Sequence, residues 1–222
     1  MTAVSESSAV RMAPWASAFA PGTISGSVYA VPASLRVEAA RLLTDQGHRV
    51  HVDFIIADDG NAIGVTPEDL IRIAKEVPEA RFDAHLILPE HNITEAVLKA
   101  AASSIHALAQ VRTETFALSP QAMETFVDLL RSLRERKVSI WTEVPVGAGP
   151  THLDHVDGAL VMLIESGTRN EADRSQLRKV SALATTTSVG IDGGVTATLA
   201  AEGRDAGADV IVSGRALFEI SD

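Results

Sequence analysis

The sequence predicts an α/β protein whose eight parallel strands close into a (β/α)8 barrel, a TIM barrel. Short runs rich in β-branched residues alternate with helix-like segments along the chain, and eight such runs can be counted. The connections between the runs are too long for hairpins, so consecutive strands should be parallel and joined by right-handed crossovers. Eight such units in 222 residues fit a closed barrel better than an open doubly wound sheet.

The helix boundaries carry specific signals. Gly47 closes the first helix, and Thr66 followed by Pro67 begins the second as a capping residue with proline at the first helical position. The expected strands cover residues 23–30, 49–56, 81–88, 105–111, 138–142, 158–164, 188–192 and 208–213. The expected helices cover residues 32–47, a segment from residue 66 onward, and residues 93–103, 119–136, 169–183 and 196–206.

The chain divides by composition into an N-terminal extension, residues 1–20, and a single barrel domain, residues 21–222. After the last strand only residues 216–222 remain, about two helical turns, where a barrel needs a helix to cover the seam between its last and first strands. The extension carries four large apolar side chains with no other evident use: Val10, Met12, Trp15 and Phe19. We therefore expect residues 8–20 to be ordered and to pack near that seam or across the N-terminal mouth of the barrel, with a partner subunit as the competing cover.

The composition excludes several classes of function. A net charge of −10 argues against a nucleic-acid partner, because phosphate backbones require clustered lysine and arginine. The absence of cysteine excludes disulfides, thiolate zinc sites and cysteine nucleophiles. No apolar run reaches the roughly 18–20 residues of a membrane span, and the N-terminus lacks the basic and apolar blocks of a signal peptide. We expect a cytoplasmic protein without membrane partners, whose pocket can still be locally positive toward a small anionic substrate.

Four ionisable side chains interrupt the apolar strands. His51 and Asp53 are two residues apart on one strand, so both side chains face the same way. His85 stands in an otherwise apolar strand, and Asp192 ends a strand just before two glycines. Two histidines and two carboxylates at one rim of a parallel barrel fit a divalent metal site. From spacing alone, a hydrogen-bonded polar cluster in the barrel mouth explains the same residues equally well.

Five motifs occur in the order and spacing of a known family. They are His51-Val52-Asp53, Asp83-Ala84-His85-Leu86-Ile87-Leu88, Val161-Met162, Asp192-Gly193-Gly194-Val195, and Gly207-Ala208-Asp209 through Val212-Ser213-Gly214-Arg215-Ala216-Leu217. From residue 23 to residue 218 the sequence resembles the ribulose-phosphate 3-epimerase family, whose fold is a (β/α)8 barrel of the ribulose-phosphate-binding type. The resemblance implies an isomerase of carbohydrate metabolism, an epimerase of the pentose phosphate type.

The resemblance also implies roles for individual residues. It implies one divalent metal ion held by His51, Asp53, His85 and Asp192, with zinc as the first choice and Fe²⁺, Mn²⁺ or Co²⁺ as alternatives. Asp53 and Asp192 would act as acid and base on opposite faces of a ketose phosphate, inverting C3 through an enediolate. The substrate would be ribulose 5-phosphate, xylulose 5-phosphate or a related ketose, and the chain would form a homo-oligomer. The expected substrate-binding residues are Ser27, His51, His85, Met162, Gly167, Arg169, Gly193, Gly194, Gly214 and Arg215.

The chain departs from the family where the family binds the substrate phosphate. The family's glycine-rich loop after the sixth strand reads Ser166-Gly167-Thr168-Arg169-Asn170-Glu171 here, and the usual Gly-Ser after the eighth strand reads Gly214-Arg215. Arg169 and Arg215 could grip an anion through their side chains, or pair with Glu165 or Glu171 at the rim. The altered loop keeps open a second reading, a non-catalytic barrel that binds a sugar phosphate or a metal.

Other polar and aromatic residues receive structural interpretations. Trp141 on the fifth strand stands where the family has a small residue, and we expect it to have a packing role, or else to narrow the pocket. Five further histidines lie in expected loops or at element ends and should be solvated: His48, His91, His106, His152 and His155.

Overall fold

The computed structural model describes residues 9–91, 93–149 and 154–221, and its main sheet is a closed barrel of eight strands. The barrel strands are β2 (Ile24–Ser27), β3 (Arg49–Ile55), β4 (Phe82–Ile87), β5 (Thr113–Leu118), β6 (Ser139–Val144), β7 (Gly158–Met162), β8 (Ser188–Asp192) and β9 (Val210–Ser213). Each strand pairs in parallel with the next, and β9 pairs with β2 to close the ring. The predicted (β/α)8 barrel is confirmed.

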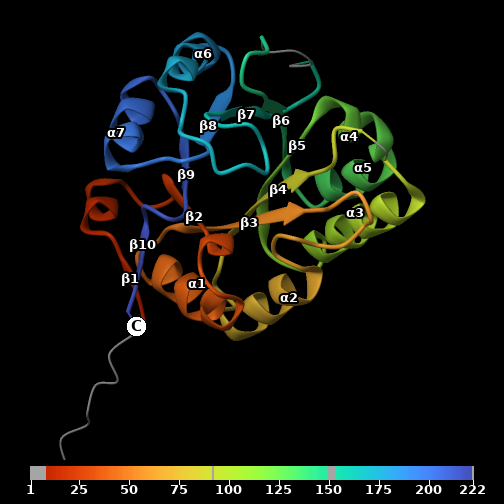
Figure 1. The fold of residues 1–222 in the computed structure, drawn as a ribbon, viewed down its shortest axis with the longest axis horizontal. Helices are drawn as coiled ribbons and strands as arrows, with labels where there is room; N and C mark the ends of the chain where they lie inside the picture. Colours follow the sequence, from red (N-terminus) through yellow and green to blue (C-terminus); the bar gives the residue numbers. More distant parts are fainter. Residues whose placement is uncertain (1–8, 92, 150–153, 222) are drawn as a thin grey trace, which may run out of the picture.

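Helices surround the barrel on its outside (Figure 1). The α-helices are α1 (Arg36–Asp45), α2 (Pro67–Glu76), α3 (Glu95–Leu108), α4 (Pro120–Thr125), α5 (Val127–Glu135), α6 (Leu177–Leu183) and α7 (Ala197–Asp205). Short 3-10 helices are η1 (Pro14–Ala18), η2 (Val28–Ala30), η3 (Ala33–Leu35) and η4 (Arg174–Gln176). The side chains of Thr66, Thr94, Ser119 and Thr196 cap α2, α3, α4 and α7. Within the described ranges, no helix is long and apolar enough to cross a membrane.

The strand expected over residues 105–111 is wrong. Helix α3 continues to Leu108, and the strand of this unit, β5, begins only at Thr113. Val97, Ala101 and Ile105 are buried at four-residue spacing, so the apolar run is the core-facing side of one long helix.

The helix expected over residues 169–183 is also too long at its start. Asp173 caps η4 by accepting the backbone N–H of Ser175, and α6 follows only from Leu177. Residues 166–169 therefore belong to the loop that follows β7, and three of them line the cavity described below.

Trp141 on β6 anchors an apolar cluster inside the barrel. Its members are Ala117, Trp141, Leu160, Met162, Val210 and Val212. The indole occupies space that two glycines leave free, because a Cβ on Gly158 would lie 2.5 Å from the ring and one on Gly190 2.9 Å from it. Trp141 therefore packs the interior, and it is not among the residues that line the cavity.

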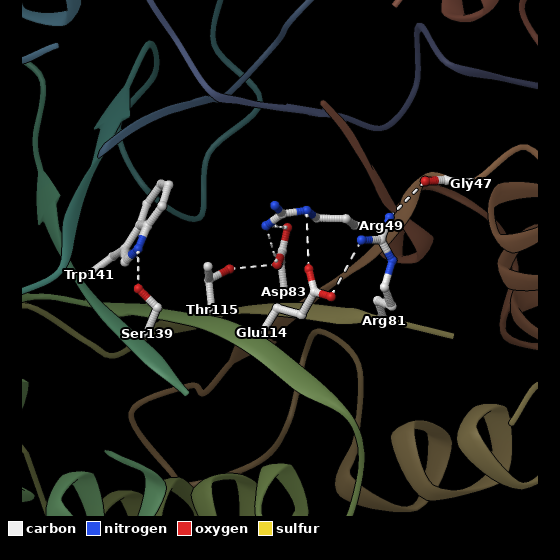
Figure 2. Close-up of polar contacts among 8 residues, drawn as sticks. All are labelled: Gly47, Arg49, Arg81, Asp83, Glu114, Thr115, Ser139 and Trp141. Atoms are coloured by element: carbon white, nitrogen blue, oxygen red, sulfur yellow. Dashed lines mark hydrogen bonds and ion pairs between the residues drawn. The ribbon is translucent and has the colours of Figure 1, made fainter. Parts of the chain in front are cut away.

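Figure 2 shows a polar network at the N-terminal ends of β3, β4 and β5. Arg49 lies 3.2 Å from Asp83 and 3.4 Å from Glu114, and Arg81 also lies 3.4 Å from Glu114. Each charge in the network thus has a partner of opposite sign. Because active sites of these barrels lie at the opposite, C-terminal ends of the strands, the network belongs to the structural end of the barrel.

The N-terminal segment and the C-terminal segment of the described chain form a two-stranded antiparallel sheet, β1 (Val10–Met12) with β10 (Phe218–Ile220). The fully buried Val10 contributes to the main core, and the indole N–H of Trp15 donates to the carbonyl of Ala216 at 3.0 Å. This sheet lies on the outside of the barrel between α7 and α1, beside the seam of β9 and β2 (Figure 1). Residues 9–20 pack where they were expected, and residues 1–8 lie outside the described residues. The segment after β9 forms a strand rather than two helical turns. The division into an extension and a barrel domain stays a prediction.

Deleting residues 1–20 should lower the melting temperature by roughly 10 °C. The deletion removes the buried side chains of Val10 and Phe19 from the core, and the burial of each contributes about 2 kcal/mol to the free energy of unfolding. One kcal/mol shifts the melting temperature of a domain of this size by about 2–4 °C. Scanning calorimetry of both chains measures the difference, and Arg11→Ala, which alters an exposed side chain of β1, should melt like the wild type. An unchanged melting temperature in the truncated chain would contradict the stabilising role.

The expectation that His48 is solvated is wrong. His48 is only 3% exposed, and burial together with the nearby charge of Arg81 lowers its pKa. The neutral imidazole is therefore the form that the fold stabilises. His91, His106 and His155 are exposed as expected, and His152 lies outside the described residues.

Candidate metal-binding site

Four side chains from three strands converge at the C-terminal end of the barrel. His51, Asp53, His85 and Asp192 each offer one ligand atom, and these atoms all lie within 4.8 Å of one another. His51 and Asp53 both point inward because they are two residues apart on β3. The register of the sheet places Asp53 beside His85 on β4, and Asp192 is the last residue of β8. The convergence expected from the sequence is thus present.

The contacts inside the cluster run between imidazole nitrogens and carboxylate oxygens. His51 Nε2 lies 3.2 Å from Asp53 Oδ1 and 4.0 Å from Asp192 Oδ2. His85 Nδ1 lies 3.6 Å from the same Asp192 oxygen, which is too long for a hydrogen bond. Both histidines are buried, whereas the Asp192 carboxylate is partly exposed.

The donor set fits a divalent cation. Two imidazole nitrogens and two carboxylate oxygens are ligands that Zn²⁺ accepts, and that Fe²⁺, Mn²⁺ and Co²⁺ also accept. His85 Nδ1 is buried and makes no hydrogen bond in the structure, although it faces the carboxylate of Asp192. Buried nitrogens normally have a partner, and a self-contained hydrogen-bonded cluster would provide one. The cluster could therefore bind a metal ion, and its orphaned nitrogen favours that interpretation.

The electrostatics of the cluster lead to the same interpretation. Burial alone would lower the pKa of His85, but the carboxylates of Asp192 and Glu143 outweigh it and raise the pKa to about 10. Burial would raise the pKa of Asp53, yet His51 and the hydroxyl of Ser27 lower it to about 2. Without a bound ion, the carboxylates thus favour the protonated forms of the histidines. A divalent cation at the same place would replace those protons and meet the same negative charge.

A cavity of about 420 Å³ opens above the cluster. Its floor includes Asp53 and Asp192, and apolar walls come from Ile55 and Ile87. A volume of this size falls within the usual range for small-molecule sites, roughly 300–1,000 Å³. The ionisable cluster and the cavity therefore form one site rather than two.

Three loops at the C-terminal ends of β7, β8 and β9 form the rim of the cavity. They contribute Gly167, Thr168 and Arg169, then Gly193, Gly194, Val195 and Thr196, and finally Gly214, Arg215 and Ala216. Gly193 has φ +103°, and a Cβ there would lie 2.6 Å from Ile164, so the turn after Asp192 requires glycine. This turn leads to the N-terminus of α7, whose free backbone N–H groups favour an anion.

The structure places most of the expected substrate-binding residues on the cavity. Ser27, Gly167, Arg169, Gly193, Gly194, Gly214 and Arg215 line it, together with Asp53 and Asp192. Met162 does not line it, since its side chain packs below with Trp141 in the interior cluster. His51 and His85 are buried and do not line it. Ser27 also has a structural contact, donating to Asp53 Oδ2 at 2.6 Å.

Neither arginine of the rim has a carboxylate partner in the described part of the chain. Arg169 and Arg215 are exposed, line the cavity, and make no ion pair with any described residue. The alternative pairing of these side chains with Glu165 or Glu171 is therefore absent from the structure. Their positive charge remains available to a ligand.

The sequence reasoning missed Glu143 and Ser166. Glu143 is 8% exposed at the inward face of β6 and contacts His85, while Ser166 contacts Glu143 from the loop after β7. The expected strand ended at residue 142, so Glu143 was assigned to a loop. Extending the alternation from Trp141 by two residues would have placed it inside the barrel.

Comparison with known proteins identifies a family and a shared fold. The model of the ribulose-phosphate 3 epimerase family matches residues 24–218. A mutant tryptophan synthase α-subunit from Pyrococcus furiosus matches with a TM-score of 0.59 and 11% identity over 88% of both chains. Phosphoribosyl anthranilate isomerase from Thermus thermophilus matches with a TM-score of 0.58 and 14% identity, over 87% of this chain and 88% of the isomerase chain. Tryptophan synthase from Mycobacterium tuberculosis matches with a TM-score of 0.56 and 18% identity, over 88% of this chain and 84% of the synthase chain. At these identities the structures share the barrel fold alone, and no curated protein was found to match the sequence.

Proposed function

The chain belongs to the ribulose-phosphate 3-epimerase family, and from that membership we propose that it is a metal-dependent isomerase that inverts C3 of a ketose phosphate. The observation that carries the proposal is the convergence of two carboxylates and two histidines on the floor of one cavity. The substrate is ribulose 5-phosphate, xylulose 5-phosphate or a related ketose. The ion is Zn²⁺, with Fe²⁺, Mn²⁺ and Co²⁺ as alternatives.

The two carboxylates supply the proton transfers. Inversion at a carbon next to a ketone requires a base on one face and an acid on the other. Asp53 and Asp192 reach the cavity from β3 and β8, strands that β9 and β2 separate in the ring, so they approach a ligand from different sides. Ser27 donates to one oxygen of Asp53, which limits rotation of that carboxylate.

A divalent cation, when bound by the four residues, supplies positive charge beside the substrate oxygens that become negative as the C3 proton leaves. The residues around it exclude bulk water from below. His85 is fully buried and His51 nearly so, and the apolar cluster of Trp141 fills the barrel beneath them. The low polarity of that interior strengthens every charge interaction at the cavity floor.

The phosphate end of the substrate lies at the rim in this proposal. The backbone after β8 and β9 offers N–H groups near Gly194 and Gly214, and Arg169 and Arg215 add two positive charges. This provides a locally positive patch on a chain whose net charge is −10. The same groups suit a phosphate and do not favour an uncharged sugar.

Replacing Arg169 or Arg215 with alanine should raise KM for the ketose phosphate about 10-fold or more, with a small change in kcat. A hydrogen bond to a charged group contributes about 1.5–3 kcal/mol, and the lost contact is equal in the ground state and the transition state. Steady-state kinetics of each variant measures the two constants. Arg174→Ala is the matched control, since Arg174 pairs with Glu202 away from the cavity. Unchanged KM in both rim variants would rule out an anion-binding role.

Interconversion of ribulose 5-phosphate and xylulose 5-phosphate, followed by NMR on the metal-loaded protein, tests the proposal. The two sugars without phosphate serve as a comparison, and they should react with much lower kcat/KM. Turnover of the phosphate esters supports the isomerase. Tight binding without interconversion of any ketose phosphate would instead establish the non-catalytic barrel.

A further inference from the structure

A third carboxylate lies behind the candidate metal site. Glu143 at the end of β6 accepts a hydrogen bond from His85 Nε2, with 2.9 Å between the nitrogen and Oε2. Its other oxygen accepts a hydrogen bond from the hydroxyl of Ser166 at 2.5 Å. Glu143 is 8% exposed and His85 is fully buried, so bulk water does not compete for these contacts.

The carboxylate determines which nitrogen of His85 can face a metal ion. With the proton on Nε2 engaged by Glu143, the lone pair of the neutral ring lies on Nδ1. That nitrogen faces Asp192 Oδ2 at 3.6 Å and has no hydrogen-bond partner in residues 9–91, 93–149 and 154–221. Glu143 is on the far side of the ring, and it is not among the residues whose ligand atoms converge. It therefore acts on the site through His85.

His51 provides an internal comparison. Its Nε2 faces the cluster, and its other nitrogen is buried without a hydrogen-bond partner among the residues that the structure describes. Within that part of the chain, only His85 of the two histidines has a carboxylate behind it. The cost of burying a carboxylate is substantial, and here it is offset by a histidine and a hydroxyl that use both of its oxygens.

Ser166 connects this arrangement to the cavity rim. It immediately precedes Gly167, Thr168 and Arg169, which line the cavity. The hydroxyl that binds Glu143 is therefore part of the loop that would contact the substrate's anionic end. Contacts run without a break from that loop, through Glu143, to His85.

We propose that Glu143 is a positioning residue, which holds His85 with Nδ1 directed at the metal ion and which Ser166 couples to the substrate-binding loop. The inference rests on the proposed function, because it requires a metal at the cluster. A carboxylate behind a metal-bound histidine fixes the ring and increases its basicity, and removing such a partner costs about 10–100-fold in metal affinity.

The test measures zinc affinity by competition with a chelator of known strength. Glu143→Leu removes the acceptor and should weaken zinc binding about 10–100-fold. Glu143→Gln keeps an acceptor oxygen but loses the charge, and we expect a loss of about 10-fold. Glu165→Gln is the matched control, since it changes an exposed carboxylate of the same loop region that contacts none of these groups. Circular dichroism of the metal-free variants monitors folding.

A second readout is specific to the orientation of the ring. In ¹⁵N-labelled zinc-loaded protein, the His85 proton should be detected on Nε2, and Glu143→Leu should shift that signal because the proton loses its hydrogen-bond acceptor. Ser166→Ala should leave zinc affinity within a few-fold of the wild type while raising KM. The comparison of Ser166→Ala with Glu143→Leu therefore separates the coupling of Glu143 to the loop from its orientation of the His85 ring.

The outcomes distinguish the inference from the proposed function. If the wild type binds zinc and inverts C3 while Glu143→Gln and Glu143→Leu bind zinc as tightly, the positioning role is overturned and the function stands. If Glu143→Leu does not fold, Glu143→Gln decides alone, and wild-type affinity in that variant overturns the role. A wild type that binds no divalent ion overturns both.

Discussion

Asp192→Asn should lower kcat for inversion at C3 by about 1,000-fold or more while leaving the barrel folded. An amide has nearly the volume of the carboxylate, but it cannot accept and return a proton, and general acid–base catalysis contributes about 10²–10⁴-fold. Asp192 is partly exposed at the cavity floor, so the amide can be solvated and the fold should tolerate the change. Steady-state assays in both directions measure the loss.

Two controls accompany this variant. The metal content must be measured, because the introduced amide would still offer an oxygen to the ion and the loss of activity should exceed any loss of metal. Asp205→Asn changes an exposed carboxylate at the end of α7 and should have wild-type activity. Near-normal turnover by fully loaded Asp192→Asn would show that another group is the base.

Removing the divalent ion with a chelator should abolish turnover and lower thermal stability. The charge that stabilises the developing oxyanion disappears with the ion, and the two carboxylates of the cluster then have only the histidines beside them. A ligand present at about 100 times its Kd stabilises the folded state by about 2.7 kcal/mol, which corresponds to roughly 5–10 °C for a chain of this size. Activity assays and calorimetry before and after chelation measure both effects.

Adding back Zn²⁺, Fe²⁺, Mn²⁺ or Co²⁺ in turn should restore activity and identify the effective ion. His51→Leu with Asp53→Leu serves as a control that lacks two ligands, and its melting temperature should not respond to added metal. Full activity after exhaustive chelation would remove the metal from the proposed function.

The fold was predictable because its signals are local and repeated. Alternating β-branched runs and Thr or Ser caps recur along the chain, and the closed barrel follows from the number of units. The strand over residues 105–111 failed because Ile105 and Leu108 continue the buried face of α3, and a short apolar run has no period of its own. The sheet of β1 and β10 pairs residues about 200 positions apart, for which the local pattern contains no signal.

The site residues were predictable where they lie on strands whose alternating apolar pattern is clear in the sequence. His51 and Asp53 reveal their common direction through their spacing, and Asp192 through the glycines that follow it. Glu143 was missed because the end of its strand was placed at residue 142 instead of Val144, and strand ends are the least certain part of any sequence pattern. Met162 was expected at the substrate, but the sequence does not show the depth at which an inward side chain lies. Its depth depends on Trp141 and the two glycines that admit the indole.

Solvent exchange at C3, followed separately for the two epimers in D₂O, tests the central claim most directly. That claim is that Asp53 and Asp192 transfer protons on opposite faces of one carbon. The wild type should incorporate deuterium at C3 of both ketose phosphates. Asp192→Asn should exchange the hydrogen of one epimer only, Asp53→Asn that of the other only, and neither variant should interconvert them. Absence of exchange in the metal-loaded wild type, or exchange from both epimers in either variant, would contradict the claim.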